Sequence, residues 1–401
     1  MTPARHGTLI VVASFLIQGV TVGGMFAYGL LFTEFEAAFG WSRATISGAV
    51  SVTTLVMGVL AMLFGSMGDR LGPRGVLSFS ALCYGAGYAL LAIVESPWQL
   101  YLFFGLLVGA GLATHDVVTL STIARWFPER RGVMSAVVKV GTAVGQFTVP
   151  LFAVSLVAAF GWRIACLVYG AVSFLVLISA AQVMRHAPEG APAAPQAPAA
   201  ADTGTGSARA AFRSTQFWIL CGSQFIVFVC LMTTTVHVMP LAVDLGAGRG
   251  AAASTLAAIG GMSILGRLLM GRAFDRIGGR RGMLVAYGVL LASFIWLQFV
   301  SSTWMLFVFV AVYGMAHGAF FVVMAPTVAE LFGTRAHGTL FGVVLFFGSV
   351  GGALGPFAAG AMFDASGSYR IAFGMLALLA ATGLVLVSRL ARASAAGDRA
   401  R

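Results

Sequence analysis

Two ten-residue polar segments, which lie half a chain length apart, carry nearly the same sequence. Residues 65–74 read Gly-Ser-Met-Gly-Asp-Arg-Leu-Gly-Pro-Arg, and residues 271–280 read Gly-Arg-Ala-Phe-Asp-Arg-Ile-Gly-Gly-Arg. The offset between Gly65 and Gly271 is 206 residues, and it also relates Gly145 to Gly351. Long apolar stretches flank both segments. The sequence therefore predicts a duplicated unit in which each polar segment is a tight loop between two helices.

The apolar stretches are long enough to cross a bilayer. Hydrophobic residues make up 59% of the chain, charged residues 9%, and the mean hydropathy is +0.94, which a water-soluble surface does not permit. A spanning helix needs about 20 apolar residues. We predict an all-α membrane protein with twelve transmembrane helices arranged as two six-helix bundles. The predicted spans are 8–32, 44–67, 75–94, 98–122, 133–156, 162–184, 216–240, 251–274, 283–301, 304–329, 338–362 and 370–390.

Composition divides the chain into four parts. An N-terminal six-helix half is predicted at 1–184 and a C-terminal six-helix half at 214–390. Between them, residues 185–213 are rich in Ala and Pro and predict a flexible cytoplasmic linker. The polar residues 391–401 predict a disordered tail.

The net charge of +11 reports membrane orientation. Eighteen arginines fall in segments on one side of the predicted spans, and only Arg43, Arg163, Arg249 and Arg370 fall on the other. Because positive loops stay in the cytoplasm, both termini are predicted to be cytoplasmic. The excess of basic over acidic residues then indicates contact with the lipid bilayer, and we expect no nucleic-acid partner.

No pattern in the sequence indicates a cofactor, a metal or an enzyme. The four cysteines lie in predicted spans without metal-ligand spacing. There is no nucleotide-binding loop and no serine-nucleophile elbow. A sensor or a membrane enzyme on this frame is disfavoured, because no soluble output domain is attached.

Several motifs together resemble a known family. They are the two Asp-Arg loops, Val236-His237-Val238-Met239-Pro240, Gly266-Arg267-Leu268-Leu269-Met270-Gly271, Glu330-Leu331-Phe332-Gly333-Thr334-Arg335 and Gly351-Gly352-Ala353-Leu354-Gly355-Pro356. The chain resembles the major facilitator superfamily, in its bacterial monocarboxylate-porter-like branch. The resemblance implies alternating access around one central site, small organic anions as substrates and protons as coupling ions. It also implies a multi-pass protein of the bacterial cytoplasmic (inner) membrane, which we expect to be a monomer. One departure is Ser263, which stands where the animal members carry an aspartate one turn before the arginine of the eighth helix.

Three charged residues lie deep in predicted spans: Asp116, Lys139 and Arg267. Asp116 is nine residues from Arg125, Lys139 is eight from Arg131, and Arg267 is eight from Asp275 of the polar segment, or roughly 12–14 Å along a helix. A charge at a helix centre costs about 2.5–3.5 kcal/mol on insertion scales. The equivalent positions of the other repeat do not carry these charges. Ala61 is equivalent to Arg267, and Leu345 is equivalent to Lys139, at the offset of 206 residues. The charges are therefore predicted to serve function rather than the fold.

The resemblance implies that the fifth and eighth helices face each other, so that Lys139 and Arg267 bind one anion. Arginine offers a planar fork for a carboxylate and lysine a compact charge. Asp116 could pair with Lys139 or carry the coupled proton. The alternatives are a static buried pair, or side chains that snorkel to the interface.

Histidines and tyrosines in the spans are further candidates. We predict that Tyr28, Tyr313 and His317 contact substrate. We also predict that His115, His237 and His317 could join Asp116 in proton coupling, because histidine titrates near physiological pH. Ordinary packing is the alternative for each of them.

The Asp-Arg loops are predicted to act as gates. Asp69 could meet the positive end of a helix and a neighbouring arginine, in contacts that break when the cytoplasmic side opens. Topology alone is the competing interpretation. The predicted gating residues are Asp69, Arg70, Arg74, Asp275, Arg276 and Arg280.

The sequence thus favours a secondary transporter that moves a small organic carboxylate together with a proton. The alternative is an efflux exporter of amphipathic small molecules. The Gly355-Pro356 element resembles an exporter signature, whereas the buried basic residues disfavour cationic cargo.

Overall fold

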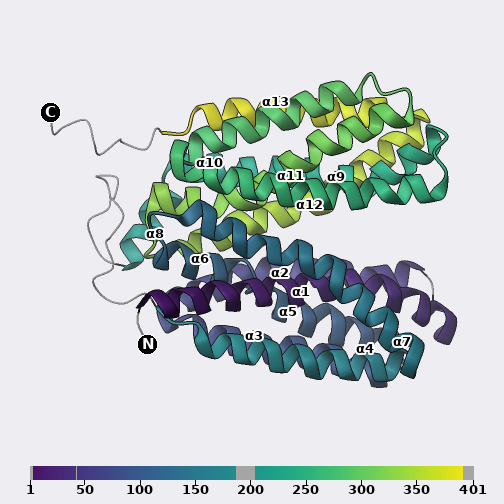
Figure 1. The fold of residues 1–401 in the computed structure, drawn as a ribbon, viewed down its shortest axis with the longest axis horizontal. Helices are drawn as coiled ribbons and strands as arrows, with labels where there is room; N and C mark the ends of the chain where they lie inside the picture. The colour runs from purple at the N-terminus through teal and green to yellow at the C-terminus, as the bar shows by residue number, and fades with distance from the viewer. Residues whose placement is uncertain (1–2, 42, 187–203, 392–401) are drawn as a thin grey trace. The chain divides into compact units, whose positions relative to one another are not determined.

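The computed structural model describes residues 3–41, 43–186 and 204–391, and within these ranges the regular elements are all helices (Figure 1). This confirms the predicted all-α class for the described part of the chain. The elements are α1 (Pro3–Phe39), α2 (Arg43–Leu71), α3 (Pro73–Leu90), η1 (Leu91–Ile93), α4 (Pro97–Leu100), η2 (Tyr101–Val108), α5 (Gly109–Leu112), α6 (Val117–Trp126), α7 (Arg131–Val183), α8 (Gly204–Phe212), α9 (Thr215–Asp244), α10 (Arg249–Leu297), α11 (Thr303–Phe332), α12 (His337–Ser366) and α13 (Arg370–Ser388).

Among the described residues, ten helices are long and apolar enough to cross a membrane, whereas twelve spans were predicted. The difference lies in α7 and α10, which each cover two predicted spans. Each contains one glycine with a non-helical backbone, Gly161 with φ 77° and Gly278 with φ 75°. A left-handed glycine turns the chain out of the helical path without the Cβ clash that other residues meet. The count of twelve and the cytoplasmic termini stay predictions.

The predicted span 98–122 is broken into short elements. A capping box of Ser96 and Gln99 starts α4, the π-helical η2 follows, and residues 113–116 form a turn between α5 and α6. Of the ten spans this one is the most buried, at 78% of its most apolar window. Hydropathy reports burial and not hydrogen-bond pattern, so the sequence could not predict the break. Irregular backbone at membrane depth is tolerated where protein surrounds it.

The chain divides into two compact units. Unit 1 takes its residues from 1–128, 137–192 and 336–342, and unit 2 takes its residues from 129–136, 193–335 and 343–401. Each unit therefore includes a short segment from the other half of the sequence. These two segments are the beginning of α7 in unit 2 and the beginning of α12 in unit 1.

The duplication is visible in the backbone. Seven glycines have positive φ angles, and six of them form three pairs at the 206-residue offset. Each pair places the same turn at the end of the same helix in both halves. The pairs are Gly40 with Gly246, Gly72 with Gly278, and Gly161 with Gly367.

Most of the predicted linker and tail lies outside the described residues, at 187–203 and 392–401. The last part of the predicted linker forms the helix α8. Its sequence contains three alanines, which favour helix, and the Trp218 Nε1 donates to the Phe212 carbonyl at 2.9 Å. Ser214 then caps α9 by accepting from the Gln216 N–H at 3.2 Å.

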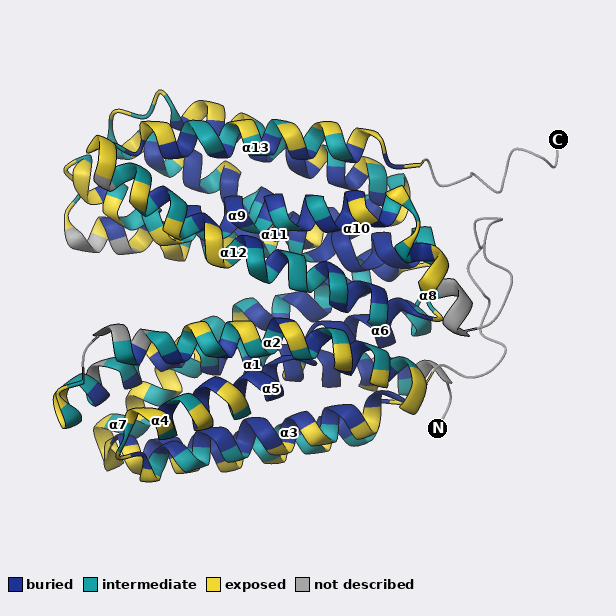
Figure 2. Ribbon diagram, turned by 180° about the vertical axis from the view of Figure 1, so that it is seen from behind, coloured by how far each residue is buried: buried dark blue, intermediate teal, exposed yellow. Residues whose placement is uncertain are grey.

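Large apolar side chains are exposed along many helices. Phe79 on α3 is 52% exposed, Leu378 on α13 is 69% exposed and Phe357 on α12 is 77% exposed. Figure 2 shows exposed positions interleaved with buried ones along α3 and α13. Lipid, and not water, is the solvent that suits such a surface.

Within unit 1, α1 crosses α7 with very little space between the two backbones. A Cβ atom on Gly145 would lie 1.9 Å from the Gly19 carbonyl oxygen, and one on Gly141 would lie 2.4 Å from the Phe15 carbonyl oxygen. Small residues of this kind permit close helix packing in membranes.

We predict that Gly145→Ala destabilises the protein by about 1–3 kcal/mol, because only a shift of backbone can accommodate the new methyl group. Thermal unfolding in detergent measures the effect. Gly29→Ala, on α1, is the matched control, since a Cβ there would meet nothing within 4 Å. Equal melting temperatures for the two variants would show that the crossing can relax.

Candidate functional site

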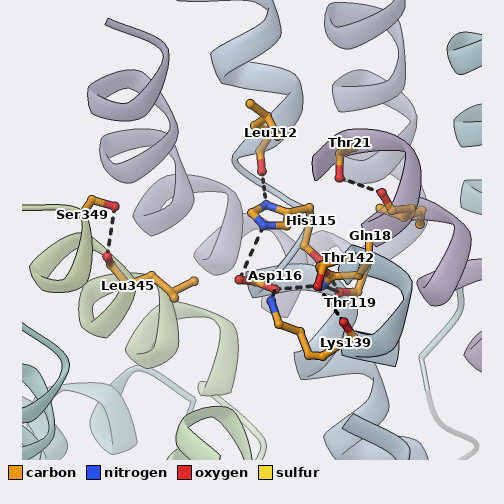
Figure 3. Close-up of polar contacts among 11 residues, drawn as sticks. Gln18, Thr21, Leu112, His115, Asp116, Thr119, Lys139, Thr142, Leu345 and Ser349 are labelled. Atoms are coloured by element: carbon orange, nitrogen blue, oxygen red, sulfur yellow. Dashed lines mark hydrogen bonds and ion pairs between the residues drawn. The ribbon is translucent and has the colours of Figure 1, made fainter. Parts of the chain in front are cut away.

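In unit 1, the turn between α5 and α6 places two titratable residues within a span. The backbone N–H of His115 donates to the Leu112 carbonyl at 3.2 Å, which is three residues back instead of the four of an α-helix. Asp116 stands at the start of α6. Beside this break, the Asp116 side chain meets Gln18 of α1 and Lys139 of α7, and the His115 ring lies between Asp116 and the Leu112 carbonyl (Figure 3). Discontinuous helices supply the binding sites of many membrane carriers.

Asp116 is the centre of this cluster. Its Oδ1 accepts from the Lys139 Nζ at 2.7 Å and from the Gln18 Nε2 at 2.8 Å. Its Oδ2 lies 3.5 Å from the His115 Nε2, and the His115 Nδ1 lies 2.6 Å from the Leu112 carbonyl oxygen. The structure thus brings together Asp116 and Lys139, which were predicted from charge, and His115, which was predicted from its titration near physiological pH (Figure 3).

Burial makes this ion pair sensitive to the loss of either partner. Lys139 is 2% exposed and Asp116 is 9% exposed. Taking two charges out of water costs several kcal/mol per ion, which the attraction between them offsets only when the geometry and the hydrogen bonds are good. Removal of one partner would leave the other charged and buried.

Gln18 on α1 is a cluster member that sequence reasoning missed. It is fully buried, and its Nε2 donates both to Asp116 and to the His115 carbonyl, at 2.8 Å each. Its Oε1 has no hydrogen-bond partner among the described residues. A signal was present, because Gln224 stands at the same place in the second repeat and amides are rare in spans.

Unit 2 holds a second buried cluster, built from two facing helical turns. On α10, Ser263 and Arg267 are one turn apart, and on α11, His317 and Phe321 are one turn apart. The His317 Nδ1 lies 3.2 Å from the Ser263 Oγ, and the Arg267 guanidinium carbon lies 5.4 Å from the Phe321 ring centroid. Arg267 is 2% exposed. The cluster can offer a fork-shaped cation and an imidazole to an anion.

Close backbone packing fixes this second cluster. A Cβ on Gly318 would lie 2.0 Å from the Ser263 carbonyl oxygen, and one on Gly266 would lie 2.1 Å from the Met315 carbonyl oxygen. The two helices therefore hold Ser263 and His317 at a fixed separation.

The predicted tyrosines and His237 bond to the protein itself. The Tyr28 Oη donates to the Ile46 carbonyl at 2.8 Å, and the Tyr313 Oη donates to the Leu231 carbonyl at 2.9 Å. The His237 ring nitrogens lie 3.1 Å from the Tyr369 Oη and 3.1 Å from the Pro356 carbonyl oxygen. These contacts hold helices together, and the substrate and proton roles of the three residues stay predictions.

The prediction that the Asp-Arg segments are loops is corrected by the structure: Asp69 lies near the end of α2, and Asp275 lies within α10, before its turn at Gly278. The two segments make the same contact in both units. In unit 1, Asp69 accepts from the backbone N–H groups of Gly338 and Thr339 at 3.1 and 2.8 Å, at the beginning of α12. In unit 2, Asp275 accepts from those of Gly132 and Val133 at 2.7 and 3.0 Å, at the beginning of α7. A carboxylate at a helix N-terminus satisfies unpaired donors and the helix dipole.

The arginines of the loops differ in their contacts. Arg125 of α6 pairs with Asp69, the Arg74 Nε donates to the Gln182 Oε1 at 2.6 Å, and an Arg280 nitrogen donates to the Ser388 carbonyl at 2.6 Å. Arg70 and Arg276 are exposed.

Two histidines near the unit 1 loop were not predicted from the sequence. Buried His337 at the start of α12 places its Nδ1 2.8 Å from the Ser121 Oγ. Beyond the end of α7, burial and then the Arg125 guanidinium lower the pKa of His186, which keeps this side chain neutral at pH 7.

In the described residues, no group of three or more His, Cys, Asp or Glu side chains could hold a metal. The helical spans, the backbone repeat and the buried charges define a polytopic membrane protein of the carrier class. The chain belongs to the Major Facilitator Superfamily, whose family model matches residues 14–295 and 238–400. This confirms the family that the motifs indicated.

Relatives and solved structures agree with this assignment. The chain is 28% identical over 396 residues to monocarboxylate transporter 13 of Rattus norvegicus, covering 95% of this chain and 88% of that protein. It is 24% identical to the agnestins efflux protein AgnL12 of Paecilomyces divaricatus, covering 94% of this chain and 84% of that protein. The structure of the fucose:proton symporter FucP of Escherichia coli superimposes with a TM-score of 0.76 at 13% identity, covering 98% of this chain and all of that one. Family and relatives indicate a multi-pass membrane transporter with a small-molecule substrate, not an enzyme.

Proposed function

We propose that this protein is a secondary transporter that moves a small organic anion, of the monocarboxylate kind, together with a proton. The observation that supports it most is the charge buried within the spans. Lys139 in unit 1 and Arg267 in unit 2 are each 2% exposed, while Asp116 is the buried acidic residue of these clusters. The unit 1 cluster contains a cation and a carboxylate, whereas the unit 2 cluster of Ser263, Arg267, His317 and Phe321 contains a cation and no acidic member, which suits an anion. The monocarboxylate relative points to the same substrate class.

In this proposal Arg267 and Lys139 have different functions. Arg267 binds the carboxylate, because a guanidinium matches it with two parallel hydrogen bonds. Lys139 donates to the Asp116 Oδ1, which also accepts from Gln18, so its charge is balanced within unit 1. His317 completes the anion site beside Arg267.

Alternating access supplies the transport step. The Asp69 and Asp275 contacts with helix N-termini are proposed to form when the cytoplasmic side is closed and to break when it opens. Contacts of this type have two discrete states, as a gate requires.

A second candidate function is the efflux of amphipathic small molecules. The fungal efflux relative covers the chain to the same extent as the monocarboxylate relative. A substrate of this kind would bind through apolar contact and would not need the buried cations.

A ligand panel separates the two functions. Thermal unfolding of the purified protein is measured with acetate, lactate, pyruvate, benzoate and malonate, and with lipophilic neutral and cationic compounds. A ligand present at 100 times its Kd stabilises the folded state by about 2.7 kcal/mol. We expect stabilisation by one or more monocarboxylates, followed by their uptake into proteoliposomes under an inward proton gradient. Stabilisation only by the lipophilic compounds would support efflux.

A further inference from the structure

One titratable side chain, His317, shares Phe321 as a neighbour with Arg267. Ser263 faces His317 on one level of the α10 and α11 pair, and Arg267 faces Phe321 on the next. Residues four apart on a helix have Cβ atoms about 5–6 Å apart. The His317 and Phe321 ring centroids are 5.0 Å apart, so the imidazole and the guanidinium lie against the same phenyl ring.

The partner of His317 accepts either protonation state. A hydroxyl both donates and accepts, so the Ser263 Oγ can bond to the His317 Nδ1 whether or not that nitrogen carries a proton. His115 differs, because a carbonyl oxygen only accepts and the Leu112 carbonyl therefore requires a proton on Nδ1. The Asp116 carboxylate differs too, because it already accepts from Lys139 and Gln18.

The described contacts of His317 come from α10 and from its own helix, with α9 behind them. From α10 they are Ser263 and, one turn further, Arg267. From its own helix Tyr313 contributes a ring at 5.9 Å, whose hydroxyl donates to the Leu231 carbonyl of α9. On α9, Cys230 is the titratable residue next to that carbonyl, and it is fully buried. Among these groups, Arg267 is the one with a permanent charge.

We propose that His317 is the proton-binding residue of the anion site, and that Ser263 positions its ring for that role. In the empty site, the Arg267 cation repels a proton on the imidazole. A carboxylate bound to Arg267 cancels that repulsion and attracts the imidazolium. Proton and anion then bind cooperatively, each raising the affinity for the other by the same factor, which for coupled sites is typically about 5–150-fold. This inference rests on the proposed anion transport and adds the means of coupling.

The test is the pH dependence of carboxylate affinity. Calorimetric titration of the detergent-purified protein is run from pH 6 to pH 9, with the member of the panel above that stabilises the wild type most. If binding takes up one proton, the Kd rises about tenfold per pH unit on the alkaline side. Titration in buffers of different ionisation enthalpy counts that proton. In His317→Gln we expect a nearly flat profile and no proton uptake. Ser263→Ala should keep the slope but move its midpoint.

Each outcome decides the inference. His6→Gln is the control, because His6 lies at the beginning of α1 against Trp126, and it should keep the wild-type slope. A slope that persists in His317→Gln assigns the proton to the substrate or to another residue and overturns the inference, while anion transport stands. If His317→Gln does not fold, two other measurements test the inference. It is overturned if carboxylate binding to the wild type takes up no proton, or if the midpoint of the pH profile does not move in Ser263→Ala. If no carboxylate binds the wild type, the proposed function fails as well.

Discussion

Arg267→Met should abolish carboxylate uptake and leave the protein folded. Truncating one partner of a buried, hydrogen-bonded charge pair costs about 2–5 kcal/mol of binding, or roughly 30- to 4,000-fold in affinity. The side chain is 2% exposed and lies against Phe321, so methionine occupies similar space without a buried charge. Replacing buried charges by apolar residues is often neutral or stabilising. Uptake into proteoliposomes and thermal unfolding measure the two effects separately.

Arg267→Lys is the matched variant, because it keeps the charge and removes the fork. We expect about a tenfold loss of affinity, since lysine cannot make two parallel hydrogen bonds to a carboxylate. Wild-type uptake by Arg267→Met would exclude this residue from the anion site. A loss of folding together with the loss of uptake would assign Arg267 a structural role.

The second large effect is expected at the Asp116–Lys139 pair. Lys139→Met leaves the Asp116 carboxylate buried with Gln18 as its remaining strong donor, and Asp116→Asn leaves the Lys139 ammonium buried beside an amide. Breaking a buried pair in this way is expected to cost about 3–5 kcal/mol of stability. The double variant should recover most of that loss, because it carries neither charge.

A double-mutant cycle of thermal or denaturant unfolding in detergent measures this coupling. For residues in contact, the departure from additivity is typically about 0.5–3 kcal/mol. Here we expect a larger departure, because each single variant leaves an unpaired buried charge and the double variant leaves none. Gln18→Leu, in the double variant and in the wild type, shows whether the amide stabilises the carboxylate. Strictly additive losses would mean that the two charges do not depend on each other.

The sequence determined the parts of this protein that depend on local pattern. The offset of 206 residues between the Asp-Arg loops predicted a duplication, and Gly72 and Gly278 share the same left-handed conformation. Apolar length predicted the helices, although α1 extends beyond the predicted 8–32 to Pro3–Phe39. Charge at membrane depth identified Asp116, Lys139 and Arg267, because an ionisable residue in lipid needs a reason to be there.

Only the tertiary structure decided how these residues are paired. Gln18 joins Asp116 across 98 positions of sequence, and His317 meets Ser263 across 54. Helices that are apolar all round carry little periodic signal, so hydropathy does not fix which face of α1 or α11 meets a neighbour. The break at residues 113–116 was hidden for the same reason. Contacts over such separations depend on helix rotation and on the close packing that glycines allow, and those are properties of the folded units.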